Sequence, residues 1–332
     1  MLIIRFSALG DVAMTIPVIY SVARQYPGER FDVVTRPFFA GLFINAPENV
    51  HVIPADFKES YRGAAGMRRL LHDLRALRPD CVADLHNVLR SWIIDNYMRL
   101  HGVRVVMVDK NRSKRRKLLS EKVPQTGFIT RYADVMARLG FPVELTFRSL
   151  YDHTPARPPF EPEHPAVGIA PFARYYNKTY PPEMMKQTAQ LLARRGYHVY
   201  LFGGRGHEAD ELSAWANDID RCTSVAGRYA LADELALMNR LDCMVSMDSA
   251  NQHMAALAGT RVVSVWGSTT PACGFMAYGQ DPDLTICLDL PCQPCSVAGK
   301  PTCPLRHLDC LCSITPEMIA GRVTKAFAGQ SH

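Results

Sequence analysis

The segment from Val245 to Pro271, VSMDSANQHMAALAGTRVVSVWGSTTP, indicates how the chain folds. Two apolar runs, residues 243–247 and 261–266, have the continuous apolar character of buried parallel strands. Between them, residues 251–258 are strong helix formers, and Gly259 stands where helices usually end. This order of strand, helix and strand predicts an α/β fold with a parallel sheet.

Polar side chains follow each of these two predicted strands. Asp248 and Ser249 precede the helix. The second strand is followed by a loop of small residues, Gly267, Ser268 and Thr269. Free N–H groups and hydroxyls at the carboxyl ends of parallel strands favour an anion, so we expect a phosphorylated ligand here. The alternative is structural, with Asp248 and Ser249 capping the helix and His253 as a hydrogen-bonded core residue.

Length and composition predict a two-domain globular protein. The chain has 332 residues, of which 48% are hydrophobic and 21% charged, with a modest net charge of +6. No apolar run is long enough to span a bilayer, and Arg5 and Asp11 interrupt the first apolar stretch, which argues against a signal peptide. We therefore expect a cytoplasmic protein whose ten cysteines are mainly reduced.

Strand-like and helix-like segments alternate through both halves of the chain. In the first half we predict strands at 2–6, 31–36, 50–54, 80–85 and 103–108, and helices at 12–24, 66–77, 89–100 and 128–139. Pro17 is expected to kink or break the first helix. In the second half we predict strands at 167–171, 198–202 and 223–226, and helices at 182–194, 207–216, 231–241 and 315–328.

A proline-rich stretch separates the two halves. Residues 141–165 contain six prolines and lack the alternating pattern, which is typical of a linker. We predict a first domain at 1–150, a linker at 151–165, a second domain at 166–314 and a final helix at 315–332. Two doubly wound α/β halves are expected to face a ligand cleft between them.

Three further loops carry residues suited to a phosphorylated ligand. Asp11 lies in the turn at the C-terminal end of the first strand, where it could be a general base or cap the next helix. Arg174 and Lys178 follow the first strand of the second half, where two cations suit a diphosphate or lie solvated. The turn of Gly203 and Gly204 lets backbone approach a ligand, and Glu208 could bind ribose hydroxyls or favour its helix dipole.

A cluster of basic residues interrupts the first half. Six of the eight residues from Lys110 to Lys117 are basic, among them Lys110, Arg112, Lys114, Arg115 and Arg116. Such a run is either a solvated loop or a landing site for a phosphorylated or membrane-bound anionic partner. It lacks interleaved aromatic residues, so we do not expect nucleic-acid binding.

A cysteine-rich segment precedes the final predicted helix. Cys292 and Cys295 form a C-x2-C pair, and Cys303 and Cys310 follow. Four such cysteines could hold a structural Zn²⁺, but the irregular later spacing favours reduced cysteines in a loop.

Taken together, these motifs resemble glycosyltransferase family 9, the lipopolysaccharide heptosyltransferases. The resemblance covers nearly the whole chain and lies in the opening residues 3–17, the loop 173–181, the turn 203–208, and the segments 248–253 and 267–271. Ala250 stands where the family usually has Gly, and Ser268 and Thr270 replace a Pro and an Asp. These departures leave the donor's sugar open.

The resemblance implies a GT-B fold, in which two Rossmann-like domains face a cleft and the last helix crosses back to the first domain. It implies inverting, metal-independent transfer of heptose from ADP-heptose to the lipopolysaccharide inner core, at the cytoplasmic face of the inner membrane. Alternatives are a related enzyme that uses another nucleotide sugar, and a non-catalytic sugar-nucleotide binder.

The resemblance also implies a role for each candidate residue. Asp11 would be the base, and Lys178 with Arg174 would bind the diphosphate. The remaining donor contacts would be Glu208 at the ribose, Tyr229 near the adenine, Asp248 at the sugar, and Ser249 and His253 around the diphosphate. The basic run from Lys110 would meet phosphates or acidic sugars of the acceptor.

Overall fold

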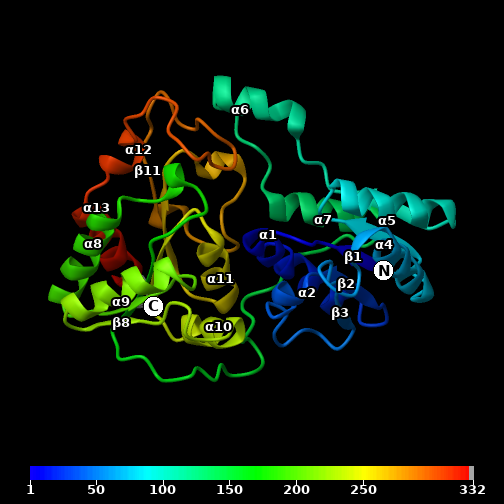
Figure 1. Cartoon of the computed structure of the whole chain (residues 1–332), viewed down its shortest axis with the longest axis horizontal. Helices are drawn as coiled ribbons and strands as arrows, with labels where there is room; N and C mark the ends of the chain where they lie inside the picture. The colour runs from blue at the N-terminus through cyan, green and yellow to red at the C-terminus, as the bar shows by residue number, and fades with distance from the viewer. Residues whose placement is uncertain (329–332) are drawn as a thin grey trace. The chain divides into compact units, whose positions relative to one another are not determined.

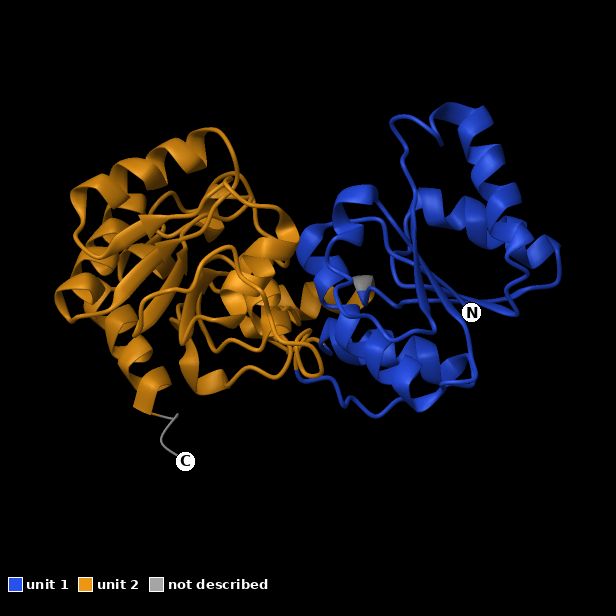
Figure 2. Ribbon diagram, turned by 90° about the horizontal axis from the view of Figure 1, so that it is seen from below, with its two compact units in different colours: residues 1–112, 126–148 blue, residues 113–125, 149–332 orange. Residues whose placement is uncertain are grey.

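The computed structural model describes residues 1–328, apart from the side chain of Arg112. The chain divides into two compact units (Figure 2). Unit 1 comprises residues 1–112 and 126–148, and unit 2 comprises residues 113–125 and the chain from Ser149 onward.

Unit 1 is a five-stranded parallel sheet with helices packed against it (Figure 1). The strands lie in the order β3-β2-β1-β4-β5 and comprise β1 (Leu2–Ile4), β2 (Phe31–Thr35), β3 (Val50–Pro54), β4 (Cys81–Asp84) and β5 (Arg104–Met107). The helices are α1 (Leu9–Ala13), α2 (Ile16–Gln25), α3 (Pro37–Ala40), α4 (Gly63–Ala76), α5 (Leu89–Leu100) and α7 (Phe128–Arg138). Every residue of β1 and β2 is buried: β1 is continuously apolar, and β2 also buries the polar side chains of Asp32 and Thr35.

The expected break near Pro17 is present. Helix α1 ends at Ala13, and α2 begins at Ile16 with Pro17 in its first turn. Proline is tolerated in a first turn because those N–H groups have no partner within the helix. The hydroxyl of Thr15 donates to the Val12 carbonyl over 2.7 Å and thereby adds a hydrogen bond to a carbonyl in the last turn of α1.

Unit 2 is a six-stranded parallel sheet. Its strands lie in the order β11-β10-β9-β6-β7-β8 and comprise β6 (Ala166–Ala170), β7 (His198–Leu201), β8 (Cys222–Ser224), β9 (Cys243–Met247), β10 (Val262–Trp266) and β11 (Thr285–Cys287). Its helices are α6 (Arg115–Glu121), α8 (Pro182–Arg194), α9 (His207–Asp218), α10 (Leu231–Asn239), α11 (Ala250–Ala258), α12 (Asp309–Cys312) and α13 (Pro316–Ala328). Short 3-10 turns are η1 (Arg112–Lys114), η2 (Tyr176–Lys178), η3 (Pro271–Cys273) and η4 (Pro282–Leu284).

Both sheets have the strand order of a doubly wound fold, which confirms the predicted α/β class with two Rossmann-like units. In unit 1 the winding direction reverses between β1 and β4, and in unit 2 it reverses between β6 and β9. The loops at the carboxyl ends of the strands on either side of such a reversal are the usual ligand site of an open α/β sheet.

The last helix differs from the expectation that it returns to the first domain. Helix α13 packs against α8 and against β9 and β10 of the second sheet. Its apolar stripe, which includes Ile319, Ala320 and Val323, is buried in the core of unit 2. The apolar face of the helix therefore packs against the second sheet. Residues 329–332 of the predicted final segment lie outside the described residues.

The expected first domain, 1–150, also differs in one internal segment. Residues 113–125 group with unit 2, which splits the basic run after Arg112. Two contacts within unit 2 account for this: Lys122 Nζ lies 2.7 Å from Asp289 Oδ1, and the Gln125 N–H donates to the Ala272 carbonyl. Among the described helices, none has the length and apolar character needed to cross a bilayer.

Candidate functional site

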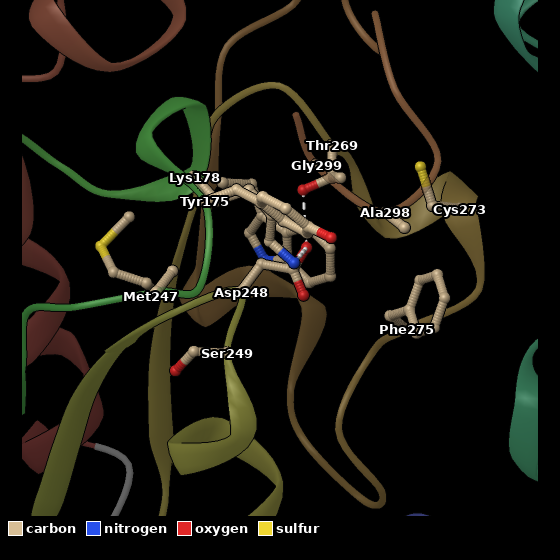
Figure 3. Close-up of polar contacts among 12 residues, drawn as sticks. Tyr175, Lys178, Met247, Asp248, Ser249, Thr269, Cys273, Phe275, Ala298 and Gly299 are labelled. Atoms are coloured by element: carbon tan, nitrogen blue, oxygen red, sulfur yellow. Dashed lines mark hydrogen bonds and ion pairs between the residues drawn. The ribbon is translucent and has the colours of Figure 1, made fainter. Parts of the chain in front are cut away.

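A buried ion pair lies at the reversal point of the second sheet. Lys178, in the turn after β6, places its Nζ 2.8 Å from Oδ2 of Asp248, which directly follows β9 (Figure 3). The two side chains are only 14% and 5% exposed. A pair this buried has lost most of its hydration, so each charge depends on the other and on nearby hydrogen bonds.

Asp248 receives two further hydrogen bonds and does not cap α11. The Thr269 hydroxyl donates to Asp248 Oδ2 over 2.6 Å, and Gln252 Nε2 donates to Oδ1 over 3.1 Å. Ser249 is the N-cap residue, but its side chain makes no cap hydrogen bond and its hydroxyl lies 3.4 Å from that of Ser246. The structural alternative for Asp248 and Ser249, that both side chains cap the helix, is therefore wrong.

Buried polar atoms next to the pair have hydrogen-bonding capacity to spare. Ser268 is 1% exposed and Gln252 is fully buried. Ser268 Oγ and Gln252 Oε1 have no hydrogen-bond partner among the described residues. Unsatisfied polar atoms are costly inside a protein, so their position beside a lysine and a loop of small residues is typical of a polar ligand site.

The cysteine-rich segment covers this site. Its residues bond back to the loop after β10: Gln293 Nε2 donates to the Gly267 carbonyl over 2.6 Å, and the Cys295 N–H donates to the Ser268 carbonyl over 3.0 Å. Gly299 packs so closely that a Cβ there would lie 2.6 Å from Lys178 Cδ. Its φ of +95° is also a backbone conformation that other residues rarely adopt. Both the close contact and the backbone conformation therefore require a glycine.

The glycine turn after β7 is organised by Glu208. One oxygen of its carboxylate accepts the Gly204 N–H over 2.6 Å, so this side chain holds the turn in the structure. A Cβ at Gly203 would meet the Leu212 side chain at 2.8 Å, which explains the glycine there by close packing. A ribose contact by Glu208 stays a prediction.

The other predicted donor residues are spread around the same edge of the sheet. Arg174 is exposed, and its guanidinium lies 5.5 Å from the ring centre of Tyr175. Tyr229 is half-buried, with its ring 6.1 Å from that of Phe160. His253 is buried within α11. Of this predicted set, the structure brings Lys178, Asp248 and Thr269 into direct contact.

In unit 1, Asp11 lies at the reversal point of the first sheet. Its carboxylate pairs with the buried Arg5 over 2.7 Å and accepts the Ala8 N–H over 3.1 Å. The side chain remains 27% exposed. Asp11 is therefore not the N-cap residue that the sequence predicted, since Ala8 holds that position and Asp11 lies in the first turn of α1, where it accepts the Ala8 N–H. A partly exposed carboxylate remains for a second role.

Two titratable groups near this loop, His86 and Asp95, have shifted pKa values. His86, which follows β4, lies 3.4 Å from the Ser7 hydroxyl, and burial together with the charge of Arg5 lowers its pKa to about 3. Farther inside, Asp95 is fully buried beside Asp84, and burial with that neighbouring carboxylate raises the pKa of Asp95 to about 8. Asp84 is fixed by the His86 and Asn87 N–H groups and by the Ser91 hydroxyl.

The basic run is mostly exposed. Lys114 and Arg116 are exposed, and Lys110 and Arg115 are half-buried. The side chain of Arg112 lies outside the described residues. Residues of the run form η1 and the first turn of α6. Positive charges at the start of a helix interact unfavourably with the helix dipole. These cations therefore have a role other than stabilising the helix.

Four residues of the two sites escaped the sequence reasoning: Arg5, Asn177, Gln252 and Gln293. Asn177 is fully buried beside Lys178, and its side-chain oxygen accepts the Lys300 N–H over 2.8 Å. Gln252 carries a readable signal, since it follows Asp248 by one helical turn. Contacts of Asn177 and Gln293 join segments distant in sequence, which no local pattern reveals.

The four cysteines of the predicted weak metal site line one pocket with His307. Burial raises the pKa of the Cys295 and Cys310 thiols, in the case of Cys310 to about 12. At Cys303 burial is outweighed by backbone N–H groups of residues 305–308, which lower the thiol pKa. Within residues 1–328, no three metal-ligating side chains are already gathered closely enough to hold an ion.

Known proteins resemble this chain over most of its length. Residues 67–305 match the model of glycosyltransferase family 9 (heptosyltransferase). Lipopolysaccharide heptosyltransferase 1 of Pseudomonas aeruginosa is 24% identical, over 91% of this chain and 86% of its own.

Solved structures share the fold. A family 9 glycosyltransferase from Veillonella parvula superimposes with a TM-score of 0.74 at 16% identity, covering 99% of this chain and 97% of the other. The E. coli heptosyltransferase WaaC with ADP-2-deoxy-2-fluoro heptose gives 0.71 at 20% identity, covering 98% of each chain. Because the family model spans well over half of the residues, the chain belongs to glycosyltransferase family 9, the heptosyltransferase family, and is a glycosyltransferase.

Proposed function

We propose that this enzyme transfers a heptose from ADP-heptose to the inner core of lipopolysaccharide, with inversion and without a metal in the reaction. The observation that carries the proposal is the buried Lys178–Asp248 pair at the reversal point of the second sheet, beside polar atoms that have spare hydrogen-bonding capacity. The name of the Pseudomonas relative and the ADP-sugar analogue bound to the E. coli neighbour support this choice of donor and acceptor.

In this proposal, Lys178 stabilises the leaving diphosphate. When the donor binds, its phosphate oxygens compete with Asp248 for the ammonium group, and the Ser268 hydroxyl supplies a further hydrogen bond. The positive charge then lies where negative charge develops as the glycosidic bond breaks. Arg174, four residues before Lys178 and exposed, adds a second positive charge for the same phosphates. Glu208 and Tyr229 hold the nucleoside.

Asp11 acts as the base. Its carboxylate takes the proton of the acceptor hydroxyl as that oxygen attacks the anomeric carbon from the face opposite the diphosphate, which gives inversion. Arg5 and the Ala8 N–H hold the carboxylate in place from behind. The mechanism requires Asp11 and Lys178 to act on opposite faces of one carbon.

The basic run binds the acceptor at the cytoplasmic face of the inner membrane. Lys114 and Arg116 offer exposed charges to acceptor phosphates. Separately, helix α5 of unit 1 carries an exposed apolar stripe, formed by Leu89, Trp92, Ile93 and Leu100. An apolar helix face suits the surface of a bilayer, where a lipid-linked acceptor is found.

The test is incubation with ADP-heptose and a truncated inner-core acceptor, with the product mass as the readout. A mass gain of one heptose on the acceptor is expected. Parallel reactions with other nucleotide sugars identify the donor. Binding of ADP-heptose without turnover on any core acceptor would instead favour a non-catalytic sugar-nucleotide binder.

A further inference from the structure

Gln252 is a fully buried amide next to the Lys178–Asp248 pair. It lies in the first turn of α11, four residues after Asp248. Its Nε2 donates to Asp248 Oδ1 over 3.1 Å and to the Phe275 carbonyl over 3.4 Å. Because both of these neighbours are acceptors, the NH2 side of the amide has to face them, which defines its orientation. One side chain thus joins the loop after β9 to the loop after η3.

The carboxylate of Asp248 divides its two oxygens between different partners. Oδ2 accepts the Thr269 hydroxyl over 2.6 Å and lies 2.8 Å from Lys178 Nζ (Figure 3). Oδ1 accepts the Gln252 amide. The ammonium group therefore meets one oxygen, which it shares with a hydroxyl. A carboxylate whose second oxygen is already engaged holds a cation less firmly than one that offers it both oxygens.

The amide at this position is not explained by core packing. The residues that follow it in α11, among them Met254, Ala255 and Leu257, are buried and apolar. A polar side chain in such a setting is unfavourable unless its groups are hydrogen-bonded. Gln252 Oε1 has no hydrogen-bond partner among the described residues, so only the contacts of Nε2 offset that cost. The amide therefore serves its two acceptors rather than the core.

We propose that Gln252 is a positioning residue, which fixes the rotation of the Asp248 carboxylate and thereby keeps Lys178 available for the donor diphosphate. Without the amide, Oδ1 would be a buried acceptor that has lost a donor, which is unfavourable. Rotation of the carboxylate would bring this oxygen to Lys178 as well, and a phosphate would compete less well for the ammonium group. The inference rests on the proposed role of Lys178 as a diphosphate ligand. Gln252 acts through Asp248 and not by contact with the donor.

The first test compares two substitutions at Gln252 by calorimetric titration with ADP-heptose over a range of pH. Gln252→Met has a similar shape but no donor, so the dissociation constant should rise about tenfold at every pH. Gln252→Glu restores a donor while it is protonated, because its O–H replaces the hydrogen bond to Asp248. Two adjacent buried carboxyl groups retain one proton well above the usual carboxyl range, so this variant should bind the donor like the wild type at about pH 6.

At higher pH the proton is lost, and Gln252→Glu places a second negative charge beside the site. Its dissociation constant should then rise about tenfold or more between about pH 6 and 9, because this charge repels the diphosphate. The other titratable groups near Asp248 are Lys178 and Cys273, and His253 follows in α11. They are present in every variant, so their titration also appears in the wild-type and Gln252→Met profiles.

The second test needs no ligand. Urea midpoints are measured for Gln252→Met, Lys178→Met and the double variant. Because both residues act on one carboxylate, the shift of the double variant should differ from the sum of the single shifts. Gln280→Met is the matched control, since Gln280 accepts the Val262 N–H and donates to the Thr260 carbonyl at the amino end of β10, the opposite edge of the sheet. Its shift should add to that of Lys178→Met, and donor affinity should not change.

The two tests separate this inference from the proposed donor. Wild-type donor affinity in Gln252→Met, a Gln252→Glu profile that runs parallel to the wild-type profile, or additive midpoint shifts with Lys178→Met overturns the positioning role. A wild-type chain that does not bind ADP-heptose contradicts the proposed donor instead, and the urea midpoints alone then decide for or against Gln252.

Discussion

Lys178 and Asp248 bind each other over 2.8 Å, and each stands at the carboxyl end of one of the two strands between which the second sheet reverses. Their strands β6 and β9 are direct neighbours with a parallel register, so the two loops that follow them emerge side by side. The pair thus lies where open α/β sheets usually bind ligands, and its lysine supplies a positive charge there.

The first prediction concerns the stability of this pair. Lys178→Met leaves the Asp248 carboxylate buried without its cation, so the free energy of unfolding should fall by about 3 kcal/mol. Lys186→Met is the matched control, since Lys186 also pairs with an aspartate at 2.7 Å but that partner, Asp218, is 60% exposed. The control should lose less than about 1 kcal/mol. Equal shifts of the urea midpoint in both variants would contradict the argument.

The second prediction concerns Asp11. Asp11→Asn keeps an oxygen for the Ala8 N–H but cannot accept a proton, so kcat should fall about 100-fold or more. Binding of ADP-heptose, measured by calorimetry, should not change, since the variant leaves unit 2 untouched. Asp80→Asn, at an exposed aspartate of the same unit, is the control and should keep full kcat. An unaltered rate in Asp11→Asn would remove Asp11 as the base.

The sequence predicts most of this fold because its strands carry a strong local signal. The prediction for β9 is correct to the residue, since its five residues are all buried and bounded by polar side chains. The prediction omits β11, because a three-residue strand after a proline-containing loop has no such signal. The packing of α13 also escapes prediction, because an apolar stripe shows that a helix is buried but does not show which sheet covers it.

The candidate site is predictable in its residues but less so in their contacts. Asp248 directly precedes a helix, where the local pattern favours a cap. Its actual partner, Lys178, lies in another loop of the chain, and only the adjacency of β6 and β9 brings the two together. The same reason hides Gln293 and Asn177, whose contacts tie the cysteine-rich segment to the loops below it.

The third prediction concerns pH and the buried Asp95. In the unfolded chain this group ionises near pH 3.8, whereas burial and Asp84 raise its pKa in the folded chain to about 8. Between these values the folded state holds a proton that the unfolded state has lost, so stability falls as pH rises, by at most about 1.4 kcal/mol per pH unit. Asp95→Asn should remove this slope and raise the urea midpoint at pH 8.

The control for this pH effect is Asp80→Asn, at an exposed aspartate of the same unit. It should leave the dependence of the unfolding midpoint on pH between about 4 and 8 as in the wild type. A wild-type stability that is flat over this range, or one that rises with pH and keeps rising in Asp95→Asn, would show that Asp95 is ionised in the folded protein.

The fourth prediction separates two costs at Gly299. Its φ is +95°, and a Cβ there would lie 2.6 Å from Lys178 Cδ and 2.7 Å from Tyr175 Cδ2. Gly279 also has a positive φ, +66°, but a Cβ added there would have no atom within 4 Å. Gly279→Ala should therefore lose only the stability due to the unfavourable backbone conformation, about 1–2 kcal/mol. Its affinity for the donor should not change.

Gly299→Ala should lose a similar stability and, in addition, displace the Lys178 side chain on which Gly299 packs. Because Lys178 is the proposed diphosphate ligand, the dissociation constant for ADP-heptose should rise about tenfold or more, which corresponds to about 1.4 kcal/mol. Calorimetric titration of both variants with ADP-heptose measures the difference directly. If Gly299→Ala binds the donor as tightly as Gly279→Ala does, the cysteine-rich segment covers Lys178 without positioning it.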